Sequence, residues 1–145
     1  MKENILEKCK EFLPTWISFS VDDFTFDPPK GFSSFTVGVH CKNEVVPKSV
    51  MYRQLDCKDN AILDFNIEKH VFVALGKSGI AVGFYHYDIN SRIEKFIDGR
   101  SLVVEDLSNT DVLKQIANRL YALHQLDIPE LPDKIFFELL HDKWG

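Results

Sequence analysis

The spacing of apolar residues changes along the first third of the chain, and the change predicts a helix followed by strands. Apolar residues near the N-terminus recur at helical spacing up to Pro14, which ends the predicted helix: Ile5, Leu6, Cys9, Phe12 and Leu13. From Phe24 to Arg53, apolar and polar positions alternate in a way that is typical of strands. We expect three strands here, separated by turns at 28–31 and 43–48: residues 24–26, 35–39 and 50–53.

Helical spacing returns in the middle of the chain. An apolar stripe from Leu63 to Leu75 predicts a second helix, with Gly76 and Gly79 as its terminators. Residues 81–87 and 91–97 then predict a hairpin that turns at 88–90.

The last third of the chain is predicted to be helical. Ser108 and Asp111 form a capping-box pair that would open a long helix. The expected buried face of that helix consists of five apolar residues: Val112, Leu113, Ile116, Leu120 and Leu123. Pro129 and Pro132 interrupt the chain before a last helix that starts with residues 135–140. The order of elements predicts an α+β fold with about five antiparallel strands and one helix inserted after the third.

Composition narrows the class of protein. A chain of 145 residues that is 45% hydrophobic is long enough for one real core. The net charge of -5, with both signs interspersed, argues against a nucleic-acid surface. No apolar run approaches the ~20 residues that span a membrane, so no membrane span is expected. Three widely spaced cysteines without a CxxC motif indicate reduced thiols, and therefore neither disulfides nor a zinc site, in a cytoplasmic protein.

Three short segments imitate catalytic motifs. Gly76-Lys77-Ser78 lacks the earlier glycine of a phosphate-binding loop, because Val71 stands there, and it ends a helix instead of starting one. His86-Tyr87-Asp88 lies in a predicted hairpin turn and lacks the asparagine that a kinase catalytic loop has five residues after its aspartate. Asp64-Phe65 precedes a helix, where an aspartate favours the helix dipole. None of the three predicts a catalytic site.

Arg53 and Glu68 are a more specific pair. A cation at the end of the third strand and a carboxylate on the next helix form an ion pair that holds the cation against nucleotide phosphates in kinases. The competing interpretation is an ordinary surface salt bridge worth ~0–1 kcal/mol, and spacing alone favours this second interpretation.

Several segments together resemble the choline/ethanolamine kinase family, whose fold is similar to that of protein kinases and aminoglycoside phosphotransferases. The 92–100 segment, Arg-Ile-Glu-Lys-Phe-Ile-Asp-Gly-Arg, matches the family's G-R-x-E-x-F-I-x-G-R hinge closely. Val50-Met51-Tyr52-Arg53 looks like its V-L-L-R strand, and the helix that carries Glu68 and the Ala122-Leu123-His124 segment resemble further family elements. The likeness runs from about Phe12 to the C-terminus but covers only the family's N-terminal lobe and first linking helices.

The resemblance implies roles for seven residues. The backbone of Lys95 and Ile97 would hydrogen-bond adenine, and Arg53 with Glu68 would hold the phosphates of ATP. The turn that would cover the phosphates contributes the remaining three residues: Gly31, Ser33 and Ser34.

The sequence also departs from the family pattern. The turn reads G-G-x-S/T-N in the family, whereas Lys30 replaces its first glycine and Ser34 its asparagine, so ATP is expected to bind weakly if at all. Neither the H-N-D-x-x-x-x-N loop, which supplies the catalytic base, nor the I-D-F-E segment, which holds Mg2+, occurs in the chain. The resemblance therefore implies a kinase-like N-terminal lobe over residues 1–100, linking helices over 101–145, and a missing C-terminal lobe that holds Mg2+.

The resemblance leaves alternative functions open. The leading interpretation is the ATP-side part of a kinase that transfers the γ-phosphate of ATP to choline or ethanolamine in phospholipid synthesis, inactive by itself. The alternative is a free-standing, catalytically dead lobe that acts as an interaction or regulatory module, and a third is a small α+β binding domain unrelated to kinases. Apolar residues of the C-terminal helices, including Phe136, Leu140 and Trp144, would lose their partner without a second lobe, which predicts a homodimer through these helices.

Overall fold

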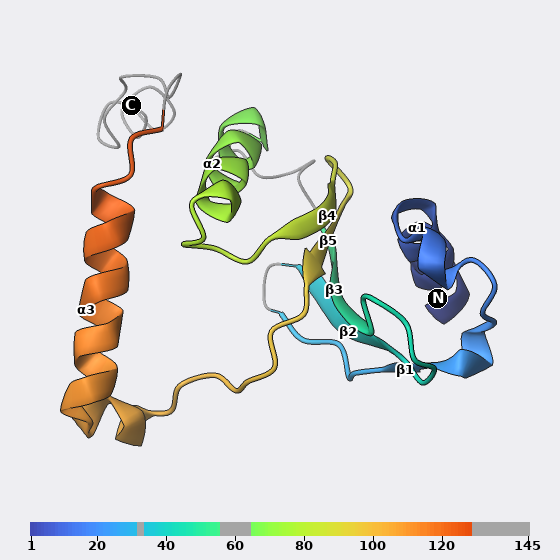
Figure 1. The fold of residues 1–145 in the computed structure, drawn as a ribbon, viewed down its shortest axis with the longest axis horizontal. Helices are drawn as coiled ribbons and strands as arrows, with labels where there is room; N and C mark the ends of the chain where they lie inside the picture. The colour runs from blue at the N-terminus through green and yellow to red at the C-terminus, as the bar shows by residue number, and fades with distance from the viewer. Residues whose placement is uncertain (32–33, 56–64, 129–145) are drawn as a thin grey trace, which may run out of the picture. The chain divides into compact units, whose positions relative to one another are not determined.

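The structure, a computed structural model, describes residues 1–31, 34–55 and 65–128 (Figure 1). The chain divides into two compact units, the first formed by Met1–Lys58 and Ala81–Ser101, and the second by Asp59–Ile80 and Leu102–Gly145. Two segments of the first unit that are distant in sequence therefore form a single structure. A division into lobes at residue 100 stays a prediction.

The first unit is built on an antiparallel sheet in the order β1-β2-β3-β5-β4 (Figure 1). Its strands are β1 (Phe24–Phe26), β2 (Phe35–Cys41), β3 (Ser49–Gln54), β4 (Phe84–Tyr87) and β5 (Ser91–Lys95). β3 lies at the centre because β5 returns from the hairpin to pair with it. The predicted fold, α+β with a five-stranded antiparallel sheet, is confirmed.

The predicted hairpin forms, but its strands are shorter than expected. β4 begins at Phe84 instead of Ala81, and its pairing with β5 shifts register between Phe84 and His86. β5 ends at Lys95, two residues before the expected end at Ile97.

The core of the first unit lies between the sheet and α1 (Lys2–Phe12), which ends before Pro14 as predicted. Alternate residues on β2, β3 and β5 point to this side, and they are buried with the apolar side of α1 and Trp16. The main contributors are Ile5, Leu6, Cys9, Leu13, Trp16, Val37, Val39, Val50, Tyr52 and Ile93. Trp16 Nε1 also donates a hydrogen bond to the carbonyl oxygen of Pro47 over 2.8 Å, which ties the short helix η1 (Pro14–Trp16) to the turn before β3.

The described part of the second unit contains α2 (Phe65–Lys77), the short helix η3 (Val104–Ser108) and α3 (Thr110–His124). Gly79 adopts φ 72° after α2, and Ile80 N donates to Leu75 O over 3.1 Å, so Gly79 acts as the predicted terminator. No helix in the described ranges is long and apolar enough to cross a membrane.

Two expectations for α3 are wrong. Its N-cap is Asn109, whose Oδ1 accepts from Asp111 N over 2.9 Å, whereas Ser108 belongs to η3 and is not the cap. The expected apolar face is not buried: no α3 residue is buried within the part of the chain that the structure describes, and Leu113 and Leu120 are 45% and 49% exposed. The predicted last helix at 135–140 lies outside the described residues.

Candidate functional site

The chain leading into β2 depends on a glycine; we call residues 30–31 and 34–36 the Gly31 turn. Gly31 adopts φ +121°, and a Cβ atom added there would lie 2.0 Å from the carbonyl oxygen of Ser34. The turn is closed by two backbone hydrogen bonds between Lys30 and Thr36, of 2.8 and 2.9 Å. Only glycine adopts this conformation without strain, so the backbone is sterically restricted at Gly31, one of the residues predicted to cover a phosphate. Ser33, also predicted to take part, lies outside the described residues.

The face of the sheet opposite α1 carries polar side chains in rows across β2, β3 and β5. Cross-strand partners share a face, so Thr36, Arg53 and Arg92 form a row beside the Gly31 turn. Four residues further along β2, His40 pairs with Ser49 at the other end of the same face. We call this surface the polar sheet face.

Two arginines share one carboxylate on the polar sheet face. Arg92 Nε donates a 2.5 Å hydrogen bond to Glu94 Oε1, and Arg53 Nε lies 3.4 Å from the same oxygen. Arg53 Nη1 also donates to Ser34 Oγ over 3.3 Å, which connects the cluster to the Gly31 turn. Two guanidinium groups therefore lie beside one carboxylate at this end of the face, and Arg53 is the more exposed of the two arginines.

The contacts that the structure describes for Arg53 do not include Glu68, its predicted partner. Glu68 lies on α2 in the second unit, and an Arg53–Glu68 pair stays a prediction. Arg53 instead contacts Glu94 and Ser34, both in its own unit. Arg92 and Glu94 belong to the 92–100 segment, but the sequence predicts no separate role for either of them. Their two-residue spacing in a predicted strand places them on one face, but the register with β3 that brings them to Arg53 was unknown.

An aromatic group occupies the other end of the polar sheet face. The His40 ring meets the Phe96 ring edge-on, with centroids 4.8 Å apart. His40 Nδ1 lies 2.9 Å from Ser49 Oγ, and Nε2 lies 3.2 Å from Asp27 Oδ1. Gly38 makes room for Asp27, because a Cβ at position 38 would lie 2.3 Å from Asp27 Oδ2. These contacts hold His40 beside the segment that carries Lys95 and Ile97.

The predicted hinge residues end β5 and leave the sheet at this aromatic end. Lys95 N donates to Gly83 O over 2.8 Å, so that amide is already bound within the sheet. Lys95 would therefore offer a ligand its carbonyl oxygen and not its N–H group. Ile97 follows the strand, with its side chain 68% exposed.

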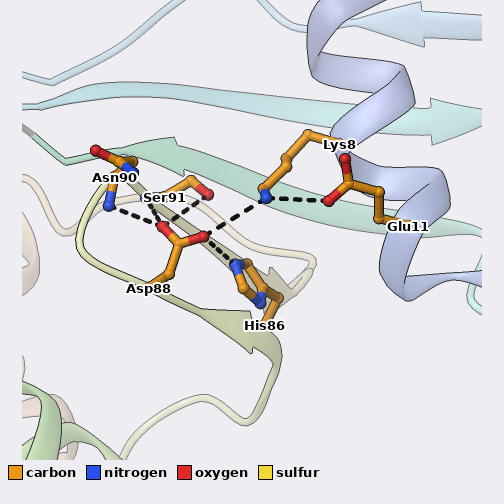
Figure 2. Close-up of polar contacts among 6 residues, drawn as sticks. All are labelled: Lys8, Glu11, His86, Asp88, Asn90 and Ser91. Atoms are coloured by element: carbon orange, nitrogen blue, oxygen red, sulfur yellow. Dashed lines mark hydrogen bonds and ion pairs between the residues drawn. The ribbon is translucent and has the colours of Figure 1, made fainter.

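The His86-Tyr87-Asp88 segment does not lie wholly in the hairpin turn, because His86 and Tyr87 end β4 and only Asp88 belongs to the turn; the segment also anchors α1 (Figure 2). Asp88 Oδ1 accepts from the backbone N–H groups of Asn90 and Ser91, each over 2.7 Å. Its Oδ2 lies 2.6 Å from His86 Nε2 and 3.5 Å from Lys8 Nζ of α1. Burial favours a higher pKa for Asp88, but the hydrogen bonds from His86, Asn90 and Ser91 outweigh it and lower the pKa to about 2.

Metal-binding side chains do not gather in the described ranges. No group of three or more His, Cys, Asp or Glu residues there is arranged to hold a metal ion. Glu94 is the carboxylate in contact with Arg53 on the polar sheet face, and two arginines already neutralise its charge. These residues do not fit a metal, so we derive no chemical step that passes through one.

Comparisons with known proteins point to one family and one fold. Residues 30–144 match the family model described as choline/ethanolamine kinase. Among solved structures, a choline kinase from Cryptosporidium parvum Iowa II is similar in fold, with a TM-score of 0.76 and 22% identity over 93% of this chain. An ethanolamine kinase from Plasmodium vivax matches with a TM-score of 0.67 and 26% identity over 97% of this chain. The chain spans 38% and 35% of the lengths of these two proteins. No protein with a curated function matches significantly.

Proposed function

Because the chain belongs to the choline/ethanolamine kinase family and has the fold of its N-terminal lobe, we propose that its polar sheet face binds ATP. The whole protein would transfer the γ-phosphate of ATP to choline or ethanolamine in phospholipid synthesis. A cytoplasmic location is part of the same proposal, supported by the cysteine pattern of the sequence.

The observation that carries the proposal is the separation of two chemically different ends on one sheet face. Arg53, Ser34 and the Gly31 turn form an electropositive end that suits phosphates. Phe96 contacts His40 at the aromatic end, and its chain neighbours Lys95 and Ile97 would pair there with adenine through Lys95 O and Ile97 N. Four residues along β2 separate the two rows, which corresponds to about 13 Å, a length that suits an extended nucleotide triphosphate.

The residues of the polar sheet face would bind ATP and orient it, and they would not themselves form or break bonds. The Arg53 guanidinium would lie against phosphate oxygens, because its planar donors match an oxyanion bidentately. The backbone N–H groups of Gly31 and Ser34 would approach the same oxygens closely. Phosphoryl transfer also needs a base for the substrate hydroxyl and a metal for the phosphates. We propose that a second lobe supplies both, because the chain contains neither family motif.

A calorimetric titration tests the binding. The 145-residue chain should bind ATP more tightly than adenosine, because adenosine lacks the phosphates that Arg53 would contact. An arginine–phosphate contact contributes ~1.5–3 kcal/mol, so Arg53→Gln should weaken ATP binding about ten- to hundredfold and leave adenosine nearly unchanged. The matched control is Arg119→Gln, which removes an exposed arginine on α3. Absence of ATP binding by the wild-type chain, or equal ATP affinity of the Arg53→Gln variant, would contradict the proposal.

The same preparation tests whether this chain is active alone. With ATP, Mg2+ and either choline or ethanolamine, we expect no phosphorylated product above a protein-free blank. Turnover that exceeds the blank and disappears in the Arg53→Gln variant would show that this chain suffices for catalysis.

The alternative function, an interaction or regulatory module, is favoured by one observation. Apolar residues of α3 are exposed, and so are Leu102 and Val104, at 55% and 79%. Exposed apolar patches of this kind mark interaction sites. This alternative predicts binding of another chain, or of a second copy, with no requirement for ATP.

A further inference from the structure

Arg53 and Arg92 are direct cross-strand partners, and their proximity needs an explanation. They face each other across β3 and β5 on the polar sheet face. Like charges directly opposite each other destabilise a sheet. A third group must therefore compensate the pair if both side chains are to stay in place.

Glu94 contributes to this compensation. Its Oε1 atom contacts both guanidinium groups, at 2.5 Å from Arg92 Nε and 3.4 Å from Arg53 Nε. Glu94 is only 6% exposed, so water screens these charges poorly. A buried carboxylate needs such partners, and Arg92 holds Glu94 in position through the shorter contact.

The two arginines are not equivalent. Arg92 has a side chain that is 10% exposed, and its guanidinium carbon lies 5.2 Å from the Tyr87 ring centroid. The Arg53 side chain is 32% exposed and reaches Ser34 at the Gly31 turn. Arg53 Nε is buried and makes no hydrogen bond in the described chain, so its 3.4 Å contact with Glu94 Oε1 is an ion pair only. Arg92 is therefore anchored, whereas the outer edge of Arg53 is accessible to a ligand.

We propose that Glu94, fixed by Arg92, is a positioning residue that aims the Arg53 guanidinium at a nucleotide polyphosphate. The carboxylate restrains the Nε edge of Arg53 and leaves for phosphate oxygens the Nη2 group and the Nη1 hydrogen that does not bond Ser34. This inference rests on the proposed ATP binding. It assigns the orientation of Arg53 to a carboxylate on β5 of the same unit, which acts through Arg53 and does not touch the ligand.

A double-mutant cycle with ATP and adenosine tests the proposal on the 145-residue chain. Glu94→Gln keeps the shape of the side chain but removes its charge, and should weaken ATP binding about fivefold with little change for adenosine. In an Arg53→Gln background, Glu94→Gln should have no further effect on ATP binding, because the residue through which it acts is gone. The matched control is Glu44→Gln, which removes an exposed carboxylate that pairs with Lys48.

Three outcomes would overturn the proposal. Glu94→Gln could tighten ATP binding, which would make Glu94 a competitor for Arg53. It could weaken ATP and adenosine binding equally, or weaken ATP binding equally with and without Arg53. Either result would make its role structural only.

A ligand-free measurement separates this proposal from the proposed function. In the 15N-labelled wild-type chain, the Arg53 Nε–H signal should be distinct from those of exposed arginines such as Arg119. In Glu94→Gln it should move to the position of the exposed arginines, while a melting curve shows that the chain stays folded. If the wild-type chain binds no ATP but this signal behaves as expected, the proposed function fails while Glu94 still positions Arg53. An unchanged Arg53 signal in Glu94→Gln overturns the positioning role.

Discussion

At the residue scale, Gly31 is the position where backbone conformation restricts the site most. Its φ of +121° and the 2.0 Å approach of an added Cβ to Ser34 O leave room for glycine only. Strained conformations of this kind cost of order 1–3 kcal/mol for other residues. The turn that faces the proposed phosphates thus depends on the absence of a side chain.

We expect Gly31→Ala to lower the free energy of unfolding by ~1–3 kcal/mol and to weaken ATP binding, because the turn must shift away from Ser34 and Arg53. Urea denaturation and calorimetry measure the two effects. Gly99→Ala is the control, since a Cβ at position 99 would meet no atom within 4 Å. Equal stability and equal ATP affinity of the two variants would show that the turn is not restricted as described.

Charged residues show where sequence reasoning reached its limit at this scale. Arg53 could be selected from the sequence because a cation that ends a strand before a helix is a recognisable pattern. Its contacts with Glu94 and Ser34 could not, because they depend on the register of β3 with β5 and on the closure of the Gly31 turn. A sequence motif identifies candidate residues, whereas the register between strands determines which of them are in contact.

At the element scale, side-chain contacts attach α1 to the β4–β5 hairpin (Figure 2). Lys8 contacts Asp88 at the turn, and the Phe12 ring stacks on the His86 ring with centroids 3.7 Å apart. The hairpin continues through β5 to Lys95. The attachment therefore holds the strand from which the proposed hinge departs.

Asp88→Asn should lower the free energy of unfolding at pH 7 by about 1 kcal/mol, after allowance for screening at this partly exposed carboxylate. Hydrogen bonds hold the pKa of Asp88 at about 2 in the folded chain, below the ordinary value of 3.8. A depressed folded-state pKa contributes stability that is present above pH 3.8 and is lost as the pH falls toward 2.

Denaturation curves at several pH values measure this contribution. The difference between wild type and Asp88→Asn should shrink between pH 4 and pH 2, whereas Asp98→Asn, at an exposed position of the same unit, should match wild type throughout. A constant difference across this range would mean that the Asp88 charge does not stabilise the attachment.

The sequence predicts which helices and strands form better than it predicts where they end and which of their faces are buried. The α1 helix and the three strands 24–26, 35–41 and 49–54 follow from apolar spacing, because burial on one side imposes that spacing. The N-cap of α3 was misplaced by one residue, because Asn109 and Ser108 are both good caps and η3 extends through Ser108. Apolar spacing in α3 predicted burial that the described chain does not provide, since a pattern does not reveal what covers it.

At the scale of the whole molecule, the exposed apolar side of α3 predicts self-association. Leu113 and Leu120 are 45% and 49% exposed, and burying such side chains against a second copy would be favourable. The apolar residues of 136–144, which also predict a homodimer, lie outside the described residues. We therefore base the expectation on α3.

Sedimentation velocity should show association that increases with concentration and weakens in Leu120→Glu. Gln115→Glu, which adds the same charge at an exposed polar position of α3, is the control. A monomer at all concentrations would contradict the expectation. Association that is equal in both variants would place the contact elsewhere.

The central claim is that the polar sheet face binds ATP, and a 15N–1H shift map on addition of ATP tests it most directly. We predict that the perturbed signals include the amides of Gly31, Ser34 and Ile97 and the Arg53 side chain, at the two ends of one sheet face. Adenosine should perturb the Ile97 end alone. Shifts confined to α1 and the opposite face of the sheet, or no shifts at all, would contradict the account.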